Sequence, residues 1–275
     1  MSFSVNTNTG ALVALQYLNA TQGQLSQAQN AINSGLKVAS AKDNGATFAI
    51  AQNQRGSVAG YAAVTDSLNR GTSAIDVALS AGQSISDLLI QLKTKALSAS
   101  DSSLDTTSRQ ALNQDFVALR DQITTIVKNA VFNGVNLVDG STNQITALAA
   151  SDGTRRITTA AQNLKQSGAI VTSKTTSTIS TQAKASTMVA TIQTSLTNVN
   201  SALAKLSAGA KKFSIQTTFT SKLADTLTAG IGQLVDADLA KESARLQSLQ
   251  VKQQLGVQAL SIANQAPQTI LSLFR

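Results

Sequence analysis

The sequence has no cysteine, no histidine and no tryptophan among its 275 residues, and its single proline is Pro267. The lack of cysteine and histidine excludes thiol nucleophiles, most zinc sites and haem ligation, so we expect no metal and no cofactor. Aromatic residues make up only 3% of the chain. Because aromatic side chains supply much of the buried area of a core, a thick single core is not expected. With so little proline, helices can run long.

The sequence also shows neither a secretory signal nor a membrane-spanning segment. No basic residue precedes an apolar run near Met1, so we expect no cleavable secretory signal. No run of 18 apolar residues occurs, and no membrane insertion is expected. If the protein leaves the cell, it needs an export route that recognises another signal.

The net charge of +8 lies in one internal segment. Residues 1–140 hold nine basic and nine acidic side chains, residues 141–222 hold nine and one, and residues 223–275 hold four and four. There is no aromatic residue between Phe132 and Phe213 to interleave with these charges. A solvated basic outer surface is therefore favoured over a nucleic-acid interface.

Apolar residues and glycines recur at alternating spacings of three and four between Tyr61 and Ala99. This period keeps one stripe of a helix facing one partner along its length. Similar stripes continue after residues 105 and 183. They predict a mainly α protein, an elongated antiparallel bundle or coiled coil of long helices. The central seam comprises Leu68, Ile75, Ile85, Leu89, Leu92, Phe116, Leu119, Ile123, Ile192, Leu203 and Leu206.

The two ends of the chain are helical, rich in glutamine and poor in charge. A stripe over residues 6–37 and two adjoining stripes after residue 245 predict helices that pack among copies of themselves. The C-terminal face is too wide for a single partner. The candidate inner-domain assembly residues are Leu15, Leu18, Leu25, Ile32, Leu36, Leu246, Leu249, Val251, Leu255, Ile262, Ile270 and Leu273.

Turn and hinge signals separate these helices. Asn44 and Gly45 form a strong turn dipeptide, and Gly230 and Gly232 indicate a second hinge. Two turn dipeptides between residues 132 and 140 predict a hairpin that caps the bundle. Residues 141–182 lack a helical period and are rich in serine and threonine, so they predict short strands or a loosely folded surface insert.

Two segments resemble bacterial flagellins. Residues 34–50, SGLKVASAKDNGATFAI, resemble the N-terminal flagellin signature, and residues 247–275, which contain ANQAPQTILSL, resemble the C-terminal one. The resemblance implies an inner coiled-coil domain from residues 1–45 with 230–275 and a central helical bundle from 46–140 with 183–229. Residues 141–182 would be a short, surface-exposed variable segment.

The same resemblance implies a subunit that self-assembles into the filament used for swimming. Its partners would be further copies of itself, the junction and cap proteins of the flagellum, the flagellar type III export apparatus, and an export chaperone that binds the C-terminal region. The protein would be exported without a cleaved signal to an extracellular filament.

Three alternatives remain open at this point. A hook–filament junction protein shares similar termini and the same export route. An enzyme could use Ser173 with Lys174 or Ser221 with Lys222, but neither pair follows a glycine-rich oxyanion loop. A basic nucleic-acid binder is weakened by the charge placement.

Overall fold

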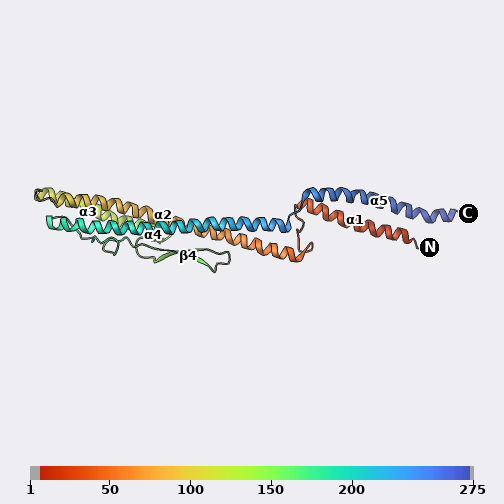
Figure 1. Ribbon diagram of the computed structural model, residues 1–275, viewed down its shortest axis with the longest axis horizontal. Helices are drawn as coiled ribbons and strands as arrows, with labels where there is room; N and C mark the ends of the chain where they lie inside the picture. Colours follow the sequence, from red (N-terminus) through yellow and green to blue (C-terminus); the bar gives the residue numbers. More distant parts are fainter. Residues whose placement is uncertain (1–6, 273–275) are drawn as a thin grey trace. The chain divides into compact units, whose positions relative to one another are not determined.

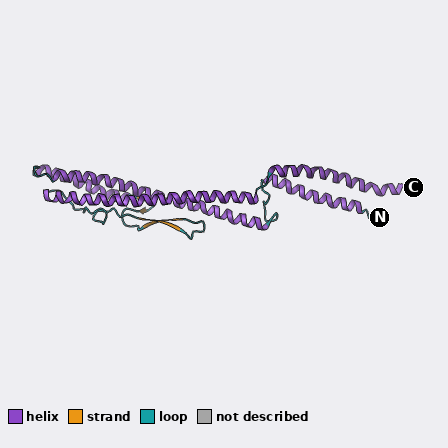
Figure 2. Ribbon diagram, in the orientation of Figure 1, coloured by secondary structure: helices purple, strands orange, loops and turns teal. Residues whose placement is uncertain are grey.

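The computed structural model describes residues 7–272, and the side chains of residues 7–265. Long helices dominate it (Figures 1 and 2). The order is α1 Thr9–Ser34, α2 Gly45–Ala99, α3 Thr106–Asn129, β1 Val131–Phe132, β2 Val135–Asn136, β3 Gln144–Leu148, β4 Arg156–Ala160, α4 Gln182–Val235 and α5 Leu239–Ser272. The predicted long-helix architecture is confirmed, and so is a small β-containing insert.

The described chain divides into two compact units. A terminal unit contains the part up to Gly56 and the part from Thr226 onward, and a central unit spans Ser57–Asp225. The boundaries fall inside α2 and α4, about three helical turns beyond the start of α2. The boundaries between the units therefore do not coincide with the turn signals at residues 44–45 and 230–232.

The central unit is built on one hydrophobic core. Stripes of α2, α3 and α4 meet there, with Leu68, Leu89, Phe116 and Phe213 fully buried. Glycines allow close contact between helices: Gly71 faces the ring of Phe213, and Gly82 faces Leu203. The narrow seam of small residues thus lets α2 and α4 lie close together.

Two antiparallel strand pairs follow α3. β1 and β2 form a hairpin in which Phe132 pairs with Val135 across Asn133 and Gly134, both at positive φ, as the predicted turn requires. β3 and β4 pair from Gln144 with Ala160 to Leu148 with Arg156.

Residues 141–182, called the outer segment below, are not merely a surface insert. Their inward-facing side chains join the core of the central unit: Ala147, Ile157, Leu164, Val171 and Ile179 are all buried. The expectation of an exposed segment needs this correction, because alternation along β4 buries every second residue against the helices.

The hinge positions differ from those expected. Gly230 and Gly232 lie inside continuous α4, which ends only at Val235. Asn44 caps the start of α2, since its side chain accepts a hydrogen bond from the amide of Thr47 at 3.0 Å. The left-handed residue is instead Gly35, which ends α1 at φ 71°. The breaks therefore lie at residues 35–44 and 236–238.

Candidate assembly surfaces

α1 and α5 pair with each other in the terminal unit. Leu25 and Ala28 of α1 are buried together with Leu249 of α5. Polar contacts extend the pairing: the amide of Gln253 donates to Gln22 Oε1 at 2.7 Å, and Asn8 Nδ2 donates to the carbonyl of Ala263 at 2.7 Å. The contact uses one stripe of each helix.

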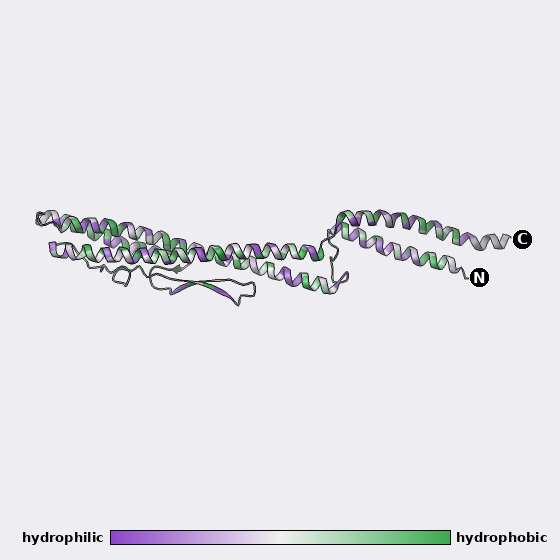
Figure 3. Cartoon of the chain, viewed as in Figure 1, coloured by the Kyte–Doolittle hydropathy of each residue, from purple (hydrophilic) through white to green (hydrophobic). Residues whose placement is uncertain are grey.

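A second set of apolar side chains on the same helices is left facing outward. Tyr17 is 71% exposed, Leu255 58% and Ile262 69%. Figure 3 shows hydrophobic residues, in green, along both helices. The other large apolar residues exposed on α1 and α5 are Leu12, Val13, Leu15, Leu239, Val251 and Val257.

The structure separates the candidate inner-domain residues into two groups. Buried or half-buried in the terminal unit are Leu18, Leu25, Ile32, Leu36, Leu246 and Leu249; exposed are Leu15, Val251, Leu255 and Ile262. The side chain of Ile270 and the whole of Leu273 lie outside the described residues. Sequence reasoning missed the exposed Leu12, Val13, Tyr17 and Val257, because they fall off the stripe that defined the helix.

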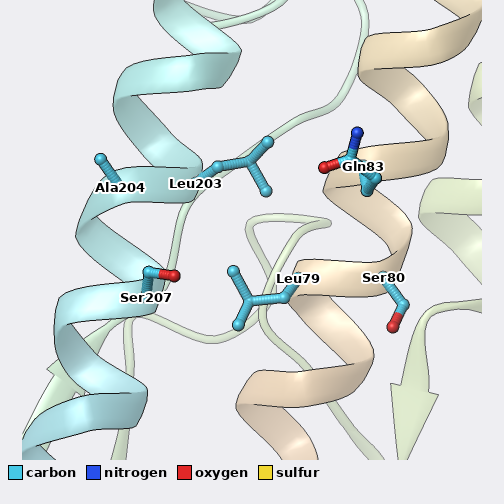
Figure 4. Close-up of a pocket in the computed structure, with 6 residues that line it drawn as sticks. All are labelled: Leu79, Ser80, Gln83, Leu203, Ala204 and Ser207. Carbon is cyan, nitrogen blue, oxygen red and sulfur yellow. The ribbon is translucent and has the colours of Figure 1, made fainter.

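The candidate seam residues come together in the central unit. Leu119 and Leu203 are half-buried, and the other nine are buried: Leu68, Ile75, Ile85, Leu89, Leu92, Phe116, Ile123, Ile192 and Leu206. Leu203 and Leu79 point toward one another across a shallow groove of about 660 Å³ between α4 and α2 (Figure 4).

Polar contacts of α3 hold the outer segment against the bundle. The guanidinium of Arg120 donates to the carbonyl of Ser177 at 2.7 Å, and Asn113 Oδ1 accepts from the amide of Ile179 at 2.7 Å. Gln166 also donates from its side chain to the carbonyl of Arg120. The outer segment is therefore part of the central unit and not a flexible appendage.

Backbone hydrogen bonds link the two connections between helices, residues 35–44 and 236–238. Within the terminal unit, the amide of Lys37 donates to the carbonyl of Val235 at 2.8 Å, and that of Ala237 donates to the carbonyl of Gly35 at 2.8 Å. Asp43 accepts from the amide of Ser40, which together with the Ser40 hydroxyl lowers the pKa of Asp43. A hydrogen-bonded bridge thus joins the two connections.

Neither serine–lysine pair has the geometry of a catalytic dyad. The buried Ser173 hydroxyl has no hydrogen-bond partner, whereas the adjacent Lys174 is exposed; Ser221 and Lys222 are both exposed. Within the described residues no cluster of three potential metal-ligating side chains occurs. Glu242 lies 3.7 Å from Arg245, one turn along α5. None of the helices over residues 7–272 is long and apolar enough to cross a membrane.

Long paired helices with unpaired apolar stripes define a helical protein with surfaces for association. Comparison with known families identifies which one. Residues 5–143 match the bacterial flagellin N-terminal helical region, and residues 189–274 match the bacterial flagellin C-terminal helical region. The chain belongs to the bacterial flagellin family, whose members are the structural subunits of the flagellar filament.

Known relatives agree with this assignment over the full length. Flagellin FljK of Caulobacter vibrioides is 56% identical over 272 residues, which cover 99% of this chain and 98% of the relative. The flagellin of Brucella melitensis is 36% identical over 294 residues, with 99% of both chains covered. The alphaproteobacterial resemblance is thereby confirmed.

Solved structures support the fold alone. Bacillus cereus flagellin superposes with a TM-score of 0.50 at 19% identity, covering 56% of this chain and 88% of that one. A proposed flagellar hook-associated protein from Vibrio parahaemolyticus gives 0.58 at 13% identity, covering 70% and 100%. Since the full-length relatives are flagellins, the junction-protein alternative is not favoured.

Proposed function

We propose that the terminal unit builds the inner layer of the filament and that its exposed apolar stripes are the surfaces through which copies pack. The observation that carries this proposal is the pair α1 and α5, which uses one stripe of each helix and leaves Tyr17, Val251, Leu255 and Ile262 outside. Burial of each such side chain contributes about 1.5–3 kcal/mol. Further copies of the same chain can cover these stripes.

The central unit and the outer segment then have separate roles. The central unit carries contacts along the filament, and the outer segment, with its basic excess, faces outward. The protein is a structural component without enzymatic activity. It acts outside the cell, after passage through the flagellar type III export apparatus with an export chaperone on the C-terminal region, and it meets the junction and cap proteins at the filament ends.

Substitution of the exposed stripe tests the assembly role. A triple variant with Val251→Ser, Leu255→Gln and Ile262→Gln removes apolar surface from α5 without touching the α1 contact. We expect the critical concentration for filament formation to rise by roughly a hundredfold or more, because three burials are lost. Sedimentation and electron microscopy of seeded assemblies measure it.

A matched control keeps the same helix and removes no apolar area: Gln247→Ser, Gln254→Ser and Gln258→Ser. We expect this control to assemble close to wild type, and both variants to keep the thermal unfolding of the central unit. Normal assembly of the apolar-to-polar variant would contradict the proposed role of the stripe.

A further inference from the structure

The outer segment runs along one side of α4. The carbonyl of Thr158 in β4 accepts a hydrogen bond from Lys212 at 3.3 Å, and the carbonyl of Ala169 accepts one from the side chain of Asn198 at 3.3 Å. The two segments are therefore antiparallel, since a contact later in the outer segment lies earlier in α4. Figure 1 shows β4 alongside α4. Exposed side chains of both segments line this junction.

Three exposed cations lie where β4 meets α4. Lys205 and Lys212 are seven residues apart, so they share one side of α4 at a rise of about 10 Å. Between them lies Gly209, where an added Cβ atom would overlap Thr159 of β4, so this is the side of α4 that β4 covers. Arg156 belongs to the outward-facing set of β4, because burial alternates along that strand. Lys212 gives one of its three donors to β4, and its charge stays exposed.

A fourth exposed cation, Lys165, extends this row. It follows the buried Leu164, which shares with Leu203 of α4 the space beside Gly82. Leu203 precedes Lys205 by two residues, so Lys165 lies near the level of Lys205 along α4. We call the four cations the basic strip: Arg156, Lys165, Lys205 and Lys212.

Little negative charge offsets the basic strip. Residues 141–222 contain nine basic side chains and a single acidic one, Asp152. Asp139 lies close to Lys165: burial raises the pKa of Asp139, but hydrogen bonds from Ser141 and then the charge of Lys165 bring it below its usual value. In the part of the chain whose side chains are described, no member of the basic strip forms an ion pair. The strip is therefore a positive surface.

The surroundings of the basic strip favour a polymer of sugar acids over other partners. No large apolar side chain is exposed in residues 141–182, so a protein partner would find no apolar anchor there. No aromatic residue lies between Phe132 and Phe213, so nucleobases would find no stacking partner. Hydroxyls are present instead, since Thr146 and Thr158 pair across β3 and β4 and are both exposed. Sugar carboxylates suit the cations, and sugar hydroxyls suit the threonines.

We propose that the basic strip binds an acidic polysaccharide built of uronic acid units. The inference rests on the proposed function, in which the outer segment faces outward and every copy in the filament presents the same strip. Single contacts between exposed charges are weak. A long polymer that crosses several copies binds several strips at once, so its avidity for a filament exceeds its affinity for one chain.

Removal of charge from α4 tests the strip. In the full chain, Lys205→Gln with Lys212→Gln removes two of its cations. Arg70→Gln with Lys211→Gln is the matched control, because both side chains are exposed but Arg70 lies on α2 and Lys211 is rotated by about 100° from Lys212. We expect the affinity of the monomer for labelled polygalacturonate at low salt to fall about five- to tenfold in the first variant and to stay within about twofold in the control. Fluorescence anisotropy measures the affinity, and circular dichroism melts establish that both variants fold.

Assembled filaments test the array. Wild-type filaments should bind polygalacturonate about tenfold more tightly than monomers do, and added salt should weaken the binding. Neutral dextran serves as the uncharged polymer and should not bind.

Four results would overturn the polysaccharide proposal: an unchanged affinity in the strip variant, an equal loss in the control, filaments that bind no more tightly than monomers, or binding of dextran. Single-stranded DNA of equal charge that binds more tightly than polygalacturonate would overturn it in favour of a nucleic acid. A wild-type chain that forms no filaments would instead contradict the proposed function, while the monomer measurement would still test the strip.

Discussion

Leu89 shows how strictly the central seam is defined at the level of single residues. Its side chain is fully buried, whereas that of its neighbour Ile90 is 53% exposed. One residue along a helix rotates the side chain by about 100°, from the core to the solvent. Two apolar residues that look equivalent in the sequence therefore have different structural roles.

We expect Leu89→Ala to lower the free energy of unfolding of the central unit by about 2–5 kcal/mol, because a large side chain is removed from a packed core. Ile90→Ala serves as the matched control, with an expected change within about 0.5 kcal/mol. Chemical denaturation followed by circular dichroism measures both. An equal loss of unfolding free energy in the two variants would show that Leu89 is no more buried than Ile90.

At the scale of elements, α1 ends at Gly35, which was not among the expected hinges, and α4 continues through Gly230, which was. Gly35 adopts φ 71°, which costs little only for glycine. Gly230 lies in helical backbone, and an added Cβ would meet nothing within 4 Å. The first glycine ends a helix, and the second merely continues one.

Alanine substitutions distinguish the two positions. Gly35→Ala should destabilise the junction of α1 by about 1–2 kcal/mol, since it forces an L side chain into the left-handed region. Gly230→Ala should stabilise α4 by up to about 1 kcal/mol, as alanine does in a helix interior. Hydrogen exchange of the amides of Lys37 and Ala237, which close the bridge between the connections, reports the first effect. Faster exchange in Gly230→Ala would instead support a hinge at that residue.

At the scale of the whole molecule, the two units differ in how much apolar surface holds them. The terminal unit buries Leu25, Ala28 and Leu249 between its paired helices, whereas the central unit shares a core that extends over three helices and the outer segment. Units with few buried apolar contacts open at low free-energy cost. We infer that the terminal unit of an unassembled chain opens first.

Limited trypsin digestion of the monomer tests this difference. Cleavage at Lys241 and Lys252 of α5 should precede cleavage at Arg70 of α2, because all three side chains are exposed on helices and only the stability of the backbone differs. Mass spectrometry of the time course identifies the sites. Cleavage at Arg70 at the same rate would mean that the terminal unit is as stable as the central one. Assembled filaments should protect the terminal sites.

The sequence alone determined the helical class, the seam and the family, because helical periodicity and two long terminal motifs are local properties of the chain. The seam of Leu68, Ile75 and Leu92 could be assigned from spacing, since a stripe at alternating threes and fours has one buried side. Spacing did not decide which stripe of α5 meets α1. Leu249 is buried there and Leu255 is exposed, and only the packed pair distinguishes them.

Tertiary contacts also decided where the helices end and what the outer segment does. α4 continues as a helix through Gly230 and Gly232. The cost of about 1 kcal/mol for a glycine in a helix is smaller than the gain from burying Ile231 and Val235. Ile157 and Leu164 enter the core through contacts with helices distant in sequence, which no local pattern reports.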